Sequence, residues 1–83
     1  MNSKRLLILG GGFLQAYVIK KAKELGYWVM VLDAYPHAIG FRYADESAVI
    51  DIVDEEACLK YAREKQIDGV LTAALFLIIL AES

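Results

Sequence analysis

Three consecutive glycines, Gly10, Gly11 and Gly12, stand between a short apolar run and a helical pattern, and this junction constrains the fold most. Residues 5–9, before the glycines, are apolar after the first position, which is typical of a strand buried on both faces. Over residues 13–25, apolar side chains recur at helical spacing, and Gly26 follows where a helix C-terminal glycine belongs. A strand, a glycine turn and a helix in this order indicate a parallel α/β unit.

The rest of the chain continues the alternation of strands and helices. The pattern predicts three further strands, at residues 27–32, 48–52 and 70–72. A second helix is expected to end near Lys65, and a final helical segment is expected at 73–81. Residues 34–43 are predicted to form a loop with room for one helical turn. Asp54 is placed to cap the second helix, and Glu55 and Glu56 suit its first turn.

Right-handed crossovers then give an α/β fold: a small, three-layer, Rossmann-like module with a four-stranded parallel sheet in the order 3-2-1-4 and helices on both faces. The 83 residues have room for one domain, spanning 1–83, whose last part, 73–83, is an atypical apolar helix.

Charge and cysteine content narrow the class of protein. The net charge is −2 and the basic residues are scattered among acids, which argues against nucleic-acid binding. A single cysteine, Cys58, excludes an internal disulfide and fits a reducing, cytoplasmic compartment. The apolar run at 70–81 is about a dozen residues long, whereas a membrane-spanning helix needs roughly 20, so no membrane partner is expected.

The glycine turn is the candidate binding site. In an open parallel sheet, ligands bind beyond the carboxyl ends of the strands, where Gly10, Gly11 and Gly12 and also Asp33 are placed. Glycines let backbone N–H groups approach a ligand, and the following helix turns its positive end to the same place, which suits a phosphate or a carboxylate. The alternative is that the glycines only form a tight turn.

A dinucleotide site is the weaker interpretation of this turn. Its fingerprint requires a third small residue at position 15, where this chain has Gln15. Asp33 lies where a ribose-binding acid would, but a loop cap or a solvated strand end explains it equally well. His37, in a loop without a second ligand residue, is interpreted as solvated, and Cys58 as a buried structural thiol, so neither a metal site nor a catalytic residue is expected.

Residues 4–74 resemble the N-terminal, pre-ATP-grasp domain of the ATP-grasp carboxylate–amine or carboxylate–thiol ligases, such as carbamoyl-phosphate synthetase, biotin carboxylase and the purine-biosynthesis ligases. The resemblance is carried by ILGGGFLQ, by AKELGYWVMVLDAYPHAIGFRYADE and by VIDIVDEEACLKYAREKQIDGVLTA. It implies that the substrate loop comprises Gly11, Gly12, Phe13, Leu14 and Gln15, that Asp33 is the acid ending the second strand, and that Asp45 is structural. It also implies that ATP and Mg²⁺ bind later domains of the parent enzyme, with no cofactor in this chain.

The chain departs from that family after residue 74, where an apolar run replaces polar residues. This departure suggests a truncated or frameshifted gene, and hence a module that is not catalytic on its own. We expect either a homo-oligomer that buries Leu75, Phe76, Ile78 and Ile79, or a missing ATP-grasp domain as partner. The alternatives are a free-standing nucleotide- or phosphate-binding module and a relic without a ligand.

Overall fold

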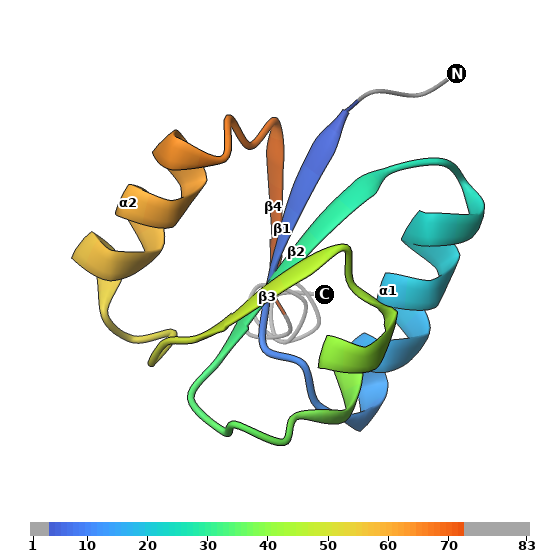
Figure 1. The fold of residues 1–83 in the computed structure, drawn as a ribbon, viewed down its shortest axis with the longest axis horizontal. Helices are drawn as coiled ribbons and strands as arrows, with labels where there is room; N and C mark the ends of the chain where they lie inside the picture. Colours follow the sequence, from blue (N-terminus) through green and yellow to red (C-terminus); the bar gives the residue numbers. More distant parts are fainter. Residues whose placement is uncertain (1–3, 73–83) are drawn as a thin grey trace, which may run out of the picture.

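The computed structural model describes residues 4–72, which form one parallel sheet covered by a helix on each face (Figure 1). The elements in chain order are β1 (Arg5–Leu9), α1 (Phe13–Glu24), β2 (Trp28–Asp33), the 3-10 helix η1 (Ile39–Tyr43), β3 (Glu46–Val49), α2 (Glu55–Glu64) and β4 (Gly69–Thr72). The sheet order is β3-β2-β1-β4, which confirms the predicted order 3-2-1-4.

The two central strands, β1 and β2, anchor the sheet. Leu7 in β1 lies opposite Met30 in β2 on one side and Val70 in β4 on the other, and all pairings are parallel. Parallel neighbours require crossover connections, and in Figure 1 the two helices lie on opposite sides of the sheet. All strands therefore end at the same edge, which is where β1 runs into the glycine turn.

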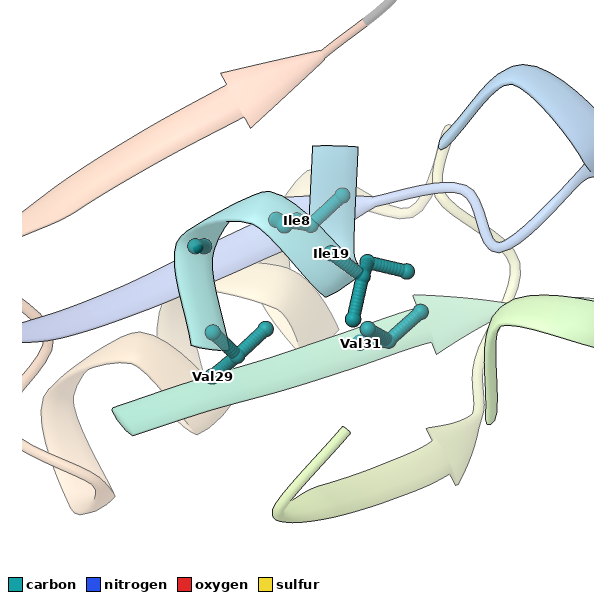
Figure 2. Close-up of a cluster of buried hydrophobic side chains, with 5 residues drawn as sticks. Ile8, Ile19, Val29 and Val31 are labelled. Carbon is teal, nitrogen blue, oxygen red and sulfur yellow. The ribbon is translucent and has the colours of Figure 1, made fainter. Parts of the chain in front are cut away.

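The core is divided between the two faces of the sheet. On the α1 side, Ile8, Ile19, Val29 and Val31 are at most 1% exposed and pack together with Ala22 (Figure 2). On the α2 side, four buried residues form a second cluster: Leu7, Met30, Leu32 and Cys58. Successive strand residues point to opposite faces, so uninterrupted apolar strands can serve both clusters.

The third strand is the main correction to the sequence prediction, because β3 spans Glu46–Val49 and not 48–52. Its residues alternate between half-buried and exposed, as expected for an edge strand that pairs only with β2. Glu46 and Ser47 were missed because an edge strand tolerates polar side chains. The chain turns after Ile50, and the Asp51 carboxylate accepts a hydrogen bond from the Val53 N–H.

The other predicted elements agree with the structure to within a residue or two. The helical turn allowed for in the loop at 34–43 is the 3-10 helix η1. As predicted, Asp54 caps α2 by accepting a hydrogen bond from the Ala57 N–H. The apolar segment predicted at 73–81 lies outside the described residues. Among the described helices, none has the length and apolar character that crossing a membrane would need.

Candidate functional site: a glycine turn at the carboxyl edge of the sheet

The glycine turn begins with a backbone conformation that other residues rarely adopt. Gly10 has φ +100°, in the left-handed region that favours glycine. Its N–H donates to the Leu32 carbonyl at 2.7 Å, so the turn remains attached to β2 after β1 has ended. The chain then turns sharply away from the sheet into α1.

The peptide groups on both sides of Gly11 are held by hydrogen bonds. The Gly11 N–H donates to Asp33 Oδ2 at 2.8 Å, and the Gly11 carbonyl accepts from the Gly40 N–H at 2.7 Å. A side chain at position 11 would lie 3.1 Å from Val31 Cγ1 and 3.3 Å from Ala38 Cβ. A Cβ here would be tightly packed and would require its neighbours to shift by a few tenths of an ångström, and the two hydrogen bonds hold the turn from two directions.

Gly40 is a site residue that the sequence analysis did not single out as functional. A Cβ at this position would lie 2.9 Å from the Gly11 carbonyl oxygen and 2.7 Å from Ile19 Cδ1. Because backbone atoms cannot give way as a flexible side chain can, η1 can approach the turn only through a glycine. In the sequence, Gly40 is only a glycine within a predicted loop, and nothing near it in the chain indicates that it packs against Gly11.

Both carboxylate oxygens of Asp33 accept hydrogen bonds from backbone N–H groups. Oδ2 accepts from the Gly11 N–H, and Oδ1 accepts from the Tyr35 N–H at 2.8 Å. Of the two roles considered for this residue, the contacts are those of a cap that ties the glycine turn to the loop after β2. Two accepted N–H groups satisfy much of the hydrogen-bonding capacity of an ionised carboxylate.

The N-terminus of α1 has no side-chain cap. Gly12 is the N-cap residue, and its backbone is extended. The first helical hydrogen bond runs from the Ala16 N–H to the Gly12 carbonyl at 2.9 Å, so the amides of Phe13, Leu14 and Gln15 precede the helical ladder. No acid occurs in the first turn. This end of the helix therefore carries positive potential that no acidic side chain of its own neutralises.

The side chains of this first turn differ in placement. Phe13 and Leu14 are 82% and 77% exposed. The Gln15 side chain lies against the turn: a Cβ at Gly12 would be 3.0 Å from Gln15 Oε1, and one at Gly10 would be 3.8 Å from Gln15 Nε2. The structure thus brings the Gln15 carboxamide together with Gly10 and Gly12 at the start of α1.

An open hollow of about 540 Å³ lies over the loop that carries η1. Six residues line it: Pro36, His37, Ala38, Ile39, Phe41 and Arg42. None of residues 10–15 lines the hollow, but two of its lining residues, Ala38 and Phe41, also pack near Gly11. His37 is exposed and meets the Tyr35 ring edge-on, with 5.8 Å between ring centroids.

The other residues considered from the sequence are Cys58, possible metal ligands and the predicted oligomer contacts. Cys58 is 8% exposed, and burial raises the pKa of its thiol, with the Asp54 and Asp51 carboxylates adding to the increase. Within residues 4–72, no group of three or more histidine, cysteine or acidic side chains is arranged to hold a metal ion. Leu75, Phe76, Ile78 and Ile79, the predicted oligomer contacts, lie outside the described residues.

Asp45 joins α1 to β2, in keeping with the structural role that the family resemblance implied. Its carboxylate accepts from Lys23 Nζ at 2.7 and 2.8 Å and from the Val29 N–H at 2.7 Å. Burial of the carboxyl raises its pKa, but the hydrogen bonds from Lys23 and Val29, together with the positive charges of Lys23 and Arg5, outweigh burial and lower the pKa from its usual value. The carboxylate thus links two elements and does not face the glycine turn.

Comparison with known proteins identifies relatives of this chain, although no family model matches it. It is 38% identical over 68 residues to formate-dependent phosphoribosylglycinamide formyltransferase from Prochlorococcus marinus subsp. pastoris. The aligned region covers 82% of this chain and 17% of that enzyme. The enzyme of the same name from Bacillus subtilis is 39% identical over 55 residues, covering 66% of this chain and 14% of the relative.

Solved structures show the same fold. N5-carboxyaminoimidazole ribonucleotide synthetase from Thermotoga maritima has a TM-score of 0.74 and 32% identity, over 83% of this chain and 19% of that one. Phosphoribosylglycinamide synthetase from Anaerococcus prevotii has a TM-score of 0.73 and 33% identity, over 86% of this chain and 18% of that one. The chain thus spans less than a fifth of the length of each relative described. By sequence and by fold, it belongs to the N-terminal, pre-ATP-grasp domains of the ATP-grasp ligase superfamily.

Proposed function

We propose that this chain is a substrate-binding N-terminal module of an ATP-dependent ligase and that its glycine turn holds an anionic group of the substrate. The observation that carries the proposal is the uncapped N-terminus of α1, presented behind a turn that Asp33 and Gly40 hold in place. A phosphate or carboxylate placed there would accept hydrogen bonds from the amides of Phe13, Leu14 and Gln15. Because the site is already ordered, an anion would bind without a large cost in backbone entropy.

The chemistry of the relatives agrees with an anionic ligand. The names of these enzymes refer to a phosphoribosyl compound or to a ribonucleotide, and one enzyme is described as formate-dependent. These groups supply a phosphate or a carboxylate, the two classes that suit a helix N-terminus.

Catalysis is assigned to the part of the relatives that this chain does not span. In the proposed arrangement, ATP and Mg²⁺ bind that other part, and residues 10–15 supply a fixed platform for one substrate. The Gln15 carboxamide, which borders the turn, would add one polar contact to the ligand. No residue of the described chain is assigned a proton-transfer or nucleophilic role.

Substitutions at Gly12 test the proposal, because they change the N-cap while the backbone conformation there suits any residue. An aspartate at this position would cap the helix and place its own carboxylate on the amides. We expect Gly12→Asp to raise the free energy of unfolding by a few tenths to about 1 kcal/mol and to abolish anion binding. Gly12→Ala should lower stability by about 0.5–1 kcal/mol and change anion affinity by less than about threefold.

The measurement is a titration of the ¹⁵N-labelled chain with ribose 5-phosphate and, separately, with formate, followed by amide chemical shifts. Wild type should show saturable shifts at residues 12–15, with Kd on the order of 1 mM for these fragments. Leu59→Asp adds the same charge on α2, across the sheet, and should leave the titration unchanged. Equal binding by wild type and Gly12→Asp would refute the site. Tight binding of NAD that is lost in Asp33→Ala would favour a dinucleotide site instead.

A further inference from the structure

The hollow over η1 is a cavity that the proposed function leaves unused. It measures about 540 Å³ and is lined by the loop between β2 and β3, at residues 36–39, 41 and 42. In Figure 1 this loop runs from the end of β2 to η1, beside α1. Ligands of an open parallel sheet bind beyond the carboxyl ends of its strands, which is where this loop begins.

Two of the lining residues anchor the hollow to the core. Ala38 is 6% exposed, and Phe41 packs against the buried cluster on the α1 side of the sheet. The Ala38 N–H donates to the Tyr35 carbonyl and the Phe41 N–H to the Ala38 carbonyl, both at 3.1 Å. A ligand would therefore meet a surface that is already formed, and little binding free energy would be lost in ordering the loop.

The loop that forms the hollow carries positive charge without an acid to neutralise it. Residues 34–44 contain no aspartate or glutamate. The flanking acids are engaged elsewhere, since Asp33 accepts two backbone N–H groups and Asp45 accepts from Lys23. Among the described residues, Arg42 takes part in no ion pair. Its guanidinium is therefore available to pair with an anion.

Two further groups add to the positive character of this region. His37 meets the Tyr35 ring edge-on, with 5.8 Å between centroids, and a histidine ring has an N–H donor in either protonation state. Lys20 Nζ lies 5.4 Å from the centroid of the Tyr43 ring, so α1 brings another cation to η1. The whole chain has a net charge of −2, so this loop is a local exception that attracts anions.

The remaining four lining residues are apolar: Pro36, Ala38, Ile39 and Phe41. Small-molecule sites combine such a lining with a few polar groups that fix the orientation of the ligand. We propose that the hollow binds a small carboxylate with an apolar body, such as an aromatic or branched-chain acid. Arg42 and His37 hold the carboxylate, to which a guanidinium fork can donate two hydrogen bonds, and the apolar residues cover the body of the ligand.

This site is separate from the glycine turn. None of residues 10–15 lines the hollow, so the inference does not rest on the proposed function. Inorganic phosphate has more acceptor oxygens than two side chains can satisfy, and it would leave the apolar lining uncovered. The hollow should therefore prefer a carboxylate with an apolar body to inorganic phosphate.

Titration of the ¹⁵N-labelled chain with sodium benzoate at constant ionic strength tests the inference. Saturable amide shifts should appear at residues 37–42, with Kd on the order of 1–10 mM. Acetate has the carboxylate without the ring, and it should bind at least about fivefold more weakly because it buries less apolar surface. Inorganic phosphate should also bind at least about fivefold more weakly.

Substitutions at the two polar residues separate charge from geometry. Arg42→Gln removes the charge and should weaken benzoate binding at least about tenfold. Arg42→Lys keeps the charge but loses the fork, and should weaken binding about threefold. His37→Gln should also weaken it about threefold. Arg63 lies in the last turn of α2 as Arg42 lies in the last turn of η1, so Arg63→Gln is the matched control and should leave binding unchanged.

Circular dichroism should show that every variant is folded. The absence of saturable shifts at residues 37–42 up to about 50 mM benzoate would overturn the inference. Equal weakening by Arg42→Gln and Arg63→Gln would do the same, because binding would then follow net charge alone. Phosphate or acetate binding as tightly as benzoate would rule out the apolar contact. Shifts confined to residues 12–15 and lost in Gly12→Asp would assign benzoate to the glycine turn instead.

Discussion

At the scale of single residues, acidic side chains connect backbone segments that are distant in sequence. Asp33 joins the turn after β1 to the loop after β2, and Asp45 joins α1 to β2. In both cases a carboxylate accepts backbone N–H groups that no strand or helix satisfies. A backbone N–H group that is left without an acceptor away from water costs free energy, so each acid stabilises the folded state by accepting these groups.

Replacing Asp33 should both destabilise the domain and disorder the glycine turn. Asp33→Ala leaves the Gly11 and Tyr35 N–H groups without their acceptor, and we expect the free energy of unfolding to fall by about 1–3 kcal/mol. Asp33→Asn keeps one acceptor oxygen and should cost roughly half as much. Urea denaturation measures both values. Asp51→Ala removes one bond in an exposed loop and serves as the control, and an equal loss in both alanine variants would contradict the role given to Asp33.

Asp45 should make stability depend on pH in the acid range. Its pKa is lowered in the folded state, so its contribution is complete above the unfolded value of about 3.9 and is lost as the pH falls through the folded value. Asp45→Asn should cost about 1–2 kcal/mol at pH 7, since Lys23 is partly solvated, and should flatten the loss of stability below about pH 4. Glu24→Gln, in an exposed ion pair, should change neither quantity.

At the scale of elements, both helices end in the same hydrogen-bond pattern, in which an amide beyond the helix returns to a carbonyl of its last turn. After α1, Gly26 adopts φ +90°, and the Tyr27 N–H donates to the Ala22 carbonyl at 3.1 Å. After α2, the corresponding position is Gln66 at φ +54°, and the Ile67 N–H donates to the Ala62 carbonyl at 2.9 Å. The second helix therefore ends with a strained residue where the first has a glycine.

This difference predicts opposite effects of matched substitutions. Gln66→Gly relieves the left-handed strain at some cost in unfolded-state entropy and should stabilise the domain by about 0.5–1 kcal/mol. Gly26→Gln introduces the same strain and should destabilise it by about 1 kcal/mol or more. Thermal unfolding by circular dichroism measures both. Changes of the same sign would show that these positions do not act through backbone conformation.

The helices and central strands could be predicted from the sequence because each carries a local signal. The glycine turn, Gly26 and the Asp54 cap fix the ends of α1 and α2 through interactions within a few residues. Edge strand β3 lacked such a signal, since Glu46 and Ser47 join the sheet only because β2 offers them hydrogen-bond partners. The 3-10 helix η1 was expected only as a possible turn, and its packing on Gly11 through Gly40 is a tertiary contact.

At the scale of the whole molecule, the sheet separates two small cores, and Cys58 belongs to the one under α2. Its thiol is the only one in the chain, and burial and the nearby acids raise its pKa. Reaction with an alkylating reagent therefore requires the α2 side of the domain to open.

Alkylation should thus report the unfolding of the domain. At pH 8 we expect iodoacetamide to react with Cys58 at least about a hundredfold more slowly in the native chain than in urea. The rate should rise in destabilised variants such as Asp33→Ala in proportion to the unfolded fraction. Mass spectrometry follows the modification. Rapid reaction of the native protein would show that α2 opens separately from the sheet.

The sequence by itself determined the fold class, the strand order and the location of the candidate site, because parallel α/β connectivity and the glycine turn are encoded in local patterns. Only the tertiary structure decided that the Asp33 carboxylate contacts the backbone of the turn, that Gly40 must lack a side chain and that Phe13 and Leu14 are exposed. Each of these depends on residues that are far apart in the chain and are brought together only by packing. Residue spacing records the period of a helix or a strand, but it carries no information on which distant backbone group lies within 3 Å of a given side chain.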